Sequence, residues 1–195
     1  MARASTFTKV PRDRIGALIG PEGRVKENIE RRLSVELTID SEAGDVTITL
    51  AKEDQDPSLL FRAKEVVTAI GRGFSPERAS RLIRDEDAAL EIMDLRAIFG
   101  RSPSDIKRIK GRIIGQEGKT RRIIEELTEA DVSVHGYTVS IIANVDQMEV
   151  AREAIQMLLR GSQHSTLYRF LHRKRRELKK KKLELWEKPP EEPEK

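Results

Sequence analysis

Residues 111–118 read Gly-Arg-Ile-Ile-Gly-Gln-Glu-Gly, and residues 16–23 read Gly-Ala-Leu-Ile-Gly-Pro-Glu-Gly. In both places an apolar stretch precedes the second glycine, and basic residues at the start of a helical pattern follow the last one. The match extends further, because Ile29 and Glu30 correspond to Ile124 and Glu125. The spacing between the two copies along the chain is longer than the repeat unit of a solenoid, so we interpret each copy as a small domain.

The pattern predicts a helix, a tight turn and a second helix in each copy, with glycines at both ends of the turn. Glycine allows positive φ and removes a side chain that would keep a ligand's backbone away. The free amides and the dipole of the second helix favour an anion above the turn. A single such turn could be an ordinary glycine cap. Its recurrence with Arg24 and Lys119 directly after the last glycine favours a phosphodiester ligand instead.

Both turns resemble the Gly-x-x-Gly loop of the K-homology (KH) RNA-binding domain, which holds about four nucleotides of single-stranded nucleic acid. The resemblance implies an α+β fold with two tandem type I KH domains of order βααββα. Each would have a three-stranded antiparallel sheet with helices on one face, and a basic C-terminal helix would follow. We expect a first KH domain at 1–73, a linking helix at 74–87, a second KH domain at 88–161, the basic helix at 162–188 and a disordered tail at 189–195.

Apolar spacing gives the expected elements in more detail. In the first copy we predict strands at 6–10, 34–39 and 46–50 and helices at 12–19, 24–33 and about 60–70. A single helix is predicted at 76–84. The second copy is predicted to have strands at 90–99, 132–135 and 137–143 and helices at 105–114, 119–129 and 146–159. Ser104 and Asp105 are the expected cap of the helix that ends at Ile114, and a further helix is expected from Ser165.

Composition limits the class of protein. The 195 residues allow two small domains and a tail, and 36% of them are charged. The absence of cysteine excludes a disulfide, a thiolate nucleophile and a Cys-ligated zinc, and fits a reducing compartment. No apolar run is long enough for a membrane span, and the N-terminus has no signal-peptide pattern. We therefore expect a cytoplasmic protein.

The net charge of +4 is unevenly distributed. Basic residues dominate residues 169–182, in which Glu177 is the one acid. Such clustering is typical of a nucleic-acid partner. Leu171, Leu178 and Leu185 lie on one face of the predicted helix, so an apolar strip docked on the body explains the leucines but leaves the charge unexplained. Both interpretations remain open at this point.

The sequence contains no complete motif for nucleotide binding or for a metal site. Gly118-Lys119-Thr120 matches the end of a phosphate-binding Walker loop, but Ile113 occupies the position of its required first glycine. The three histidines are dispersed and lack metal-ligand spacing. We expect no enzyme activity, no cofactor and no metal.

The candidate RNA-binding residues lie in the two glycine loops, beside them and on the basic helix. Apolar positions beside the loops are also candidates, namely Ile15, Leu18 and Ile19 in the first copy and Ile113 and Ile114 in the second, although only part of them is expected to touch a base. Both loops carry a glutamate where many KH loops carry a cation, and the flanking basic residues are candidates to offset it. The predicted set is Gly115, Gln116, Glu117, Gly118, Lys119, Arg121, Arg122, Arg112, Lys110, Ile113, Ile114, Gly20, Pro21, Glu22, Gly23, Arg24, Lys26, Arg173, Lys174, Arg175 and Arg176.

The whole chain is similar to archaeal relatives of the Partner-of-NOB (Dim-two) pre-ribosomal RNA processing factors. The resemblance rests on the spacing of the two loops, on Gly-Phe-Ser-Pro-Glu-Arg-Ala at 73–79, on Asp-Leu-Arg at 94–96 and on Gly-Ser-Gln-His at 161–164. It implies a positioning cofactor that binds the 3′ region of small-subunit ribosomal RNA during assembly. The implied partners are single-stranded RNA, the NOB endonuclease and a translation initiation factor subunit. We expect a monomer and no membrane contact.

Other functions remain possible on the sequence. One KH copy could have lost RNA binding and dock a translation or assembly factor, or the chain could bind single-stranded DNA or assist exosome-type RNA decay. Within the leading hypothesis, we predict that the second domain is the main RNA reader. The loop between its last two strands is short, at His135-Gly136-Tyr137, whereas the corresponding loop at 40–45 is acidic.

Overall fold

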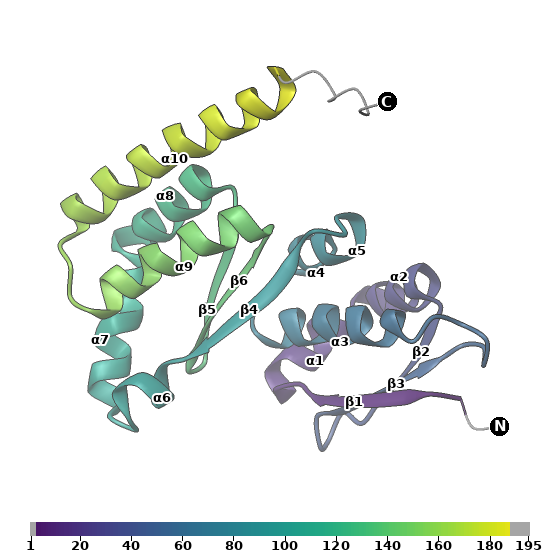
Figure 1. Cartoon of the computed structure of the whole chain (residues 1–195). Helices are drawn as coiled ribbons and strands as arrows, with labels where there is room; N and C mark the ends of the chain where they lie inside the picture. The colour runs from purple at the N-terminus through teal and green to yellow at the C-terminus, as the bar shows by residue number, and fades with distance from the viewer. Residues whose placement is uncertain (1–2, 188–195) are drawn as a thin grey trace, which may run out of the picture.

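The computed structural model describes residues 3–187 of the 195-residue chain, so the predicted tail at 189–195 lies outside the described residues. It has two units, each with a three-stranded antiparallel sheet that is covered by helices on one face (Figure 1). The order of elements is βααββα in both units, with one additional short helix in the second. The predicted α+β fold class is confirmed.

The first unit begins at a strand on the edge of its sheet, whose order is β1-β3-β2. Val35 and Leu37 of β2 point into the core and Glu36 and Thr38 point to solvent, as a strand with one covered face requires. The elements are β1 (Ser5–Lys9), α1 (Arg12–Ile19), the 3-10 turn η1 (Pro21–Gly23), α2 (Arg24–Leu33), β2 (Val35–Ile39), β3 (Asp45–Leu50) and α3 (Ser58–Gly71).

The second unit repeats this plan with the sheet order β4-β6-β5 and ends in a long helix. Its elements are β4 (Ala89–Asp94), α6 (Leu95–Phe99), α7 (Pro103–Ile114), the 3-10 turn η2 (Gln116–Gly118), α8 (Lys119–Thr128), β5 (Asp131–His135), β6 (Thr138–Ala143), α9 (Val145–Leu159) and α10 (His164–Glu187).

Two sequence predictions around α6 are wrong. The strand predicted at 90–99 ends at Asp94, because the Asp94 carboxylate accepts a hydrogen bond from the Arg96 amide at 2.8 Å and caps a short helix. The following helix α7 is capped by Ser102 instead of Ser104, and Pro103 takes its first position. Both errors concern caps that lie inside an apolar pattern, where periodicity alone gives no boundary.

The link between the units is two short helices, α4 (Pro76–Ala79) and α5 (Arg81–Arg84), where one helix was predicted. Ser75 caps α4 through the Arg78 amide, as the Ser-Pro pair indicates. Arg81 binds the second unit at several points: its guanidinium donates to the Glu129 carbonyl at 2.8 Å, to Asp131 at 3.2 Å and to Gln147 at 2.8 Å. The link is therefore fastened to the second unit.

The outer face of the second sheet is covered by the first unit (Figure 1). Every residue of β6 is buried, and Ile142 belongs to the apolar core of the first unit, against which Leu90 also packs. The Ser133 hydroxyl donates to the Arg72 carbonyl at 2.9 Å. The two units thus share apolar core, and this fixes their relative orientation.

The last helix, α10, lies along α8 and α9 (Figure 1). Leu167, Phe170 and Leu171 are buried in the core of the second unit, and Leu178 packs partly against it. Leu171 and Leu178 of the predicted strip accordingly belong to a docking face, whereas the side chain of Leu185 lies outside the described part of the structure. Among the residues that the structure describes, no helix has the length and apolarity needed to span a membrane.

Candidate nucleic-acid interface

The two glycine loops have the same backbone conformation. Gly20 and Gly115 both have φ 72° and ψ 176°. Glu22 has φ 54° and Glu117 has φ 51°, so a non-glycine residue takes the left-handed region in each loop. The repeated sequence therefore encodes one loop geometry twice, including its strained position.

The two glycines of each loop serve different purposes. A Cβ on Gly20 would lie 2.3 Å from Cγ2 of Val25, and a Cβ on Gly115 would lie 2.3 Å from Oγ1 of Thr120. The first glycine thus permits close packing of the following helix. A Cβ on Gly23 or on Gly118 would meet no atom within 4 Å. The last glycine has a positive φ and leaves open space above the loop, where a ligand's backbone could approach.

The backbone amides correct one detail of the sequence analysis. The first amide of α2 is not free, because the Arg24 amide bonds to the Pro21 carbonyl, and the Lys119 amide bonds likewise to the Gln116 carbonyl. The remaining donors lie within the loop. In residues 3–187, the amides of Gln116 and Glu117 make no hydrogen bond, whereas Pro21 has no amide proton to offer. The second loop consequently has one more donor for an anion.

The carboxylates of the two loops are held differently. Oε2 of Glu22 lies 2.5 Å from Nη2 of Arg24, so that this arginine is occupied by its own loop. In the second loop Arg122 donates to the backbone carbonyl of Glu117 at 3.0 Å, and in the described part of the chain the Glu117 side chain has no ion-pair partner. Because a carbonyl is uncharged, this hydrogen bond holds the Arg122 guanidinium beside the loop without neutralising its charge.

Some of the predicted cations lie beside the loops, and others form ion pairs or hydrogen bonds within the protein. Lys119 is exposed beside the second loop. Lys26 and Arg121 form ion pairs along their own helices, with Glu30 at 3.8 Å and Glu125 at 3.9 Å.

Two cations of α7 bond to carbonyls. Nζ of Lys110 donates to the Gly136 carbonyl at 2.9 Å, next to the short turn of the second sheet. Nη2 of Arg112 donates to the Ser162 carbonyl at 2.6 Å, which holds the start of α10 in place. Arg112 is accordingly part of a structural junction.

The apolar candidates separate by burial. Ile113 is fully buried in the core of the second unit, as Ile15 and Leu18 are in the first. Ile19 and Ile114, at the edge of the loops, remain partly exposed. Of the apolar set, these two are available to a base.

The turn between the last two strands contacts the segment that leads into the glycine loop in each unit. The Val10 amide, just before α1, bonds to the Gly44 carbonyl at 2.8 Å, and Lys110 of α7 bonds to the Gly136 carbonyl at 2.9 Å. In the first unit this turn is acidic: the Asp40 carboxylate accepts the amides of Glu42 and Ala43 at 2.9 Å each. The carboxylate is charged at neutral pH, and these hydrogen bonds stabilise the charged form and lower the pKa of Asp40 further.

The corresponding turn of the second unit offers an aromatic ring in place of an acid. Tyr137 is 52% exposed, and the guanidinium carbon of Arg96 lies 4.7 Å from the centre of its ring. Sequence analysis missed this pair, because the two residues are brought together only by the pairing of Asp94 with Thr138 across β4 and β6. An exposed ring backed by an arginine is suited to stacking on a base.

The candidate basic residues of α10 lie further along this helix than the point at which it contacts the residue behind the second loop. The Tyr168 hydroxyl approaches Thr120 behind the second loop at 3.2 Å, and Arg173, the first of the candidate cations on this helix, lies about 8 Å further along it. Arg173 and Lys174 share Glu177, at 3.8 Å and 3.1 Å, while Arg175 and Arg176 are exposed. Within residues 3–187 no group of three or more potential ligand side chains could hold a metal ion.

Comparisons with known proteins follow the division into two units. A KH domain family model matches residues 5–85, and a model of the second KH domain of PNO1, a eukaryotic type (type I) KH domain, matches residues 89–176. A KH domain-containing protein of Methanocaldococcus jannaschii is 47% identical over 180 residues, which are 92% of this chain and 78% of that protein. The RNA-binding protein pno1 of Dictyostelium discoideum is 24% identical over 82% of this chain and 66% of its own length.

Solved structures agree with these matches. A protein of unknown function from Aeropyrum pernix superposes with a TM-score of 0.88 at 43% identity, covering 95% of this chain and 98% of its own. Dim2p of Pyrococcus horikoshii, in a complex with a/eIF2alpha and rRNA, superposes with a TM-score of 0.83 at 48% identity and covers 90% of this chain and 96% of its own. The chain spans between half and two thirds of the length of several eukaryotic relatives.

Proposed function

Because this chain belongs to the PNO1 (Dim2) family of archaeal KH-domain pre-rRNA processing factors, we propose that it binds the 3′ region of small-subunit ribosomal RNA. It would act as an assembly and processing cofactor in the cytoplasm, without enzymatic activity of its own. The observation that carries the proposal is the repeated loop, in which Gly23 and Gly118 leave open space above a turn with positive φ.

The relatives supply the chemical class of the ligand. Two of them are named for RNA binding or pre-rRNA processing, and a solved neighbour is a complex with rRNA. In this chain, the free amides of Gln116 and Glu117 and the cations Lys119 and Arg122 suit a phosphodiester backbone, while Ile114 and Tyr137 suit bases.

Protein partners form part of the proposal. The same neighbour includes a/eIF2alpha, so a translation initiation factor subunit is a proposed partner of this chain. The NOB endonuclease is a second proposed partner, and it would cut the RNA that this chain positions.

Binding to a labelled RNA that ends in the 3′ sequence of small-subunit rRNA tests the proposal. We expect the chain to prefer this RNA over a shuffled RNA and over DNA of the same sequence, and to shift to the shuffled level when both loops are changed. Equal affinity for all three nucleic acids would refute the rRNA assignment.

A protein-docking role of the first unit is the second candidate. Pro21 removes an amide donor, Glu22 occupies Arg24, and the ionised Asp40 adds a negative charge to the turn between β2 and β3. These features weaken the first loop as an anion site. The surface of the first unit is therefore a candidate for contact with a protein partner. Measuring the RNA affinity of each loop variant separately discriminates the two roles.

A further inference from the structure

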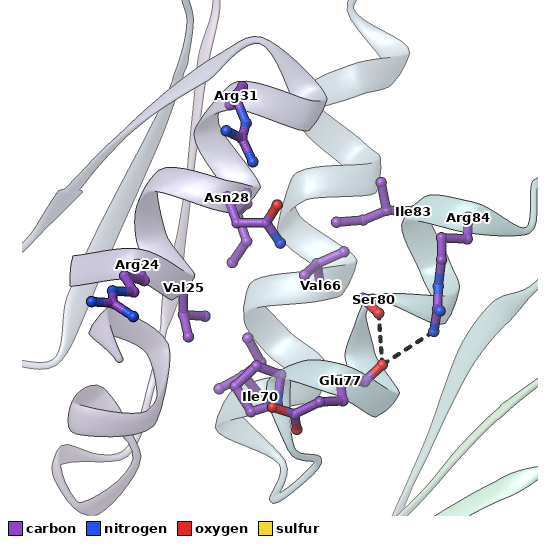
Figure 2. Close-up of a pocket in the computed structure, with 12 residues that line it drawn as sticks. Arg24, Val25, Asn28, Arg31, Val66, Ile70, Glu77, Ser80, Ile83 and Arg84 are labelled. Carbon is purple, nitrogen blue, oxygen red and sulfur yellow. Dashed lines mark hydrogen bonds between the residues drawn. The ribbon is translucent and has the colours of Figure 1, made fainter. Parts of the chain in front are cut away.

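A groove runs along the first unit between α2, α3 and the linking helices, and its volume is about 420 Å³. Figure 2 shows Val25 and Asn28 of α2 on the left, Ile83 on the right, Val66 of α3 between them and Ile70 of α3 lower in the view. The floor is aliphatic, and no aromatic side chain lines it. The groove is distinct from the acidic turn at 40–44, which connects β2 to β3.

The second unit has a corresponding groove, and there it is filled. Helices α8 and α9 are the counterparts of α2 and α3, and α10 lies between them with Leu167, Phe170 and Leu171 buried. Thr120, the counterpart of Val25, bonds to Tyr168 of α10. The internal repeat thus provides an example of what such a groove accepts, namely a helix with apolar residues spaced three and four apart.

The first unit cannot fill its own groove in this way. Its chain also turns back after α3, but α4 ends at Ala79 and Arg81 is bound to the second unit. The segment that follows α3 therefore leaves the groove after two short helices. An apolar floor remains without the helix that covers its counterpart.

Charge on the rim selects the kind of helix. Arg24, Arg31 and Arg84 line the groove, against Glu77 as the one acid among its lining residues, and of the three arginines Arg24 is paired with Glu22. In the described part of the chain Arg31 makes no ion pair, and Arg84 donates to the Glu77 carbonyl at 3.4 Å. The rim is basic, so a partner with acidic flanks is favoured and α10 of a second copy, with its cationic face, is repelled.

We propose that this groove is a docking site for an amphipathic helix of a partner protein, with an aliphatic stripe on the floor and Asp or Glu toward Arg31 and Arg84. The inference gives the second candidate function, protein docking by the first unit, a specific surface, and it is independent of the proposed RNA binding by the glycine loops. RNA is the less suitable ligand because the floor lacks rings for stacking. The docked helix would touch Val25, which packs behind Gly20, as Tyr168 touches Thr120 behind Gly115.

A pair of peptides tests the proposal on the full chain. Both are helix-stapled and fluorescent and keep the apolar spacing of Leu167, Phe170 and Leu171; one carries glutamates at the remaining polar positions and the other carries lysines. We expect saturable binding of the acidic peptide by fluorescence anisotropy. The basic peptide should bind roughly tenfold more weakly or not at all.

Chain variants locate the binding site. Asn28→Trp places a large ring over the partly exposed groove and should abolish acidic-peptide binding. Arg31→Glu with Arg84→Glu should weaken it roughly tenfold. Lys64→Glu, a charge reversal on α3 outside the groove lining, is the matched control and should leave binding unchanged. Circular dichroism and the melting temperature establish that each variant is folded.

Several results would overturn the proposal. These are failure of the acidic peptide to bind, equal binding of the two peptides, or binding that survives Asn28→Trp. A tenfold loss of RNA affinity in the Arg31→Glu, Arg84→Glu variant would reassign the groove to nucleic acid. Because the peptide assay contains no RNA, its outcome is independent of whether the glycine loops bind rRNA.

Discussion

The Tyr168 hydroxyl lies 3.2 Å from Oγ1 of Thr120, and the same oxygen stands 2.3 Å from where a Cβ on Gly115 would be. One buried threonine therefore connects the last helix to the second glycine loop. The first loop has Val25 at this position and no such fastening. The two loops share a backbone conformation but differ in what supports them.

Tyr168→Phe should lower the free energy of unfolding by about 1 kcal/mol, because the buried Thr120 hydroxyl loses a hydrogen-bond partner. Urea denaturation measures the change. Tyr137→Phe, on an exposed ring, serves as the control and should change stability by less than about 0.5 kcal/mol. Equal effects of the two substitutions would contradict the role assigned to Tyr168.

The second loop should contribute more to RNA affinity than the first. We expect Gln116→Asp with Glu117→Asp to weaken binding to the 3′ rRNA fragment by about fivefold, since Gln116→Asp adds one negative charge near a phosphate, which costs on the order of 1 kcal/mol, while Glu117→Asp keeps its charge. The paired variant is Pro21→Asp with Glu22→Asp, measured by the same titration after a check of folding. A larger loss in the first-loop variant would reverse the assignment.

The exposed cations of α10 should contact phosphates without reading sequence. Deleting the helix from Arg169 would also remove the buried Phe170 and Leu171, so substitution is the cleaner experiment. Changing Arg175, Arg176 and Lys179 to Gln should weaken all RNAs alike and make the slope of log affinity against log salt shallower by roughly 2. An altered preference among RNA sequences, at undiminished affinity, would count against this role.

The acidic turn of the first unit should repel RNA. Asp40 is ionised at neutral pH, and two amide hydrogen bonds stabilise the charged form and lower its pKa further. Asp40→Asn keeps an oxygen acceptor for these amides but removes the charge, so RNA affinity should rise several-fold at low salt and less at high salt. Asp54→Asn, in the turn at the other end of β3, should have no effect. Unchanged affinity in the Asp40 variant would place the RNA away from this turn.

Arg81 should be a principal stabiliser of the two-unit arrangement. Its guanidinium is hydrogen-bonded to Glu129, Asp131 and Gln147 of the second unit. Arg81→Ala should cost about 2 kcal/mol or more in the free energy of unfolding. Arg81→Lys should rescue little, because a single ammonium cannot reproduce the fork of donors. Full rescue by lysine would show that charge alone matters.

Sequence reasoning was most successful where local chemistry decides the structure. The glycine loops follow from Gly20, Gly23 and their repeats, whose positive φ is a property of those residues. The end of β4 was misplaced because Leu95 continues the apolar pattern, although Asp94 carried the signal of a helix cap.

The partners of side chains could not be predicted from spacing. Arg112 was expected among the RNA-binding residues, yet its guanidinium bonds to the Ser162 carbonyl, far away in the chain. Its role as an RNA ligand stays a prediction. Tyr137 gained its place beside Arg96 through strand pairing alone. Such contacts depend on tertiary packing, which a single sequence does not specify.

The burial of β6 on both faces limits how this protein can be divided for study. A fragment that begins at β4 would expose Ile142 and Leu90, which pack against the first unit in the whole chain. Fresh apolar surface on an isolated sheet promotes self-association. Baits cut at the domain boundary would then recover copies of themselves, so partners are best sought with the full-length polypeptide.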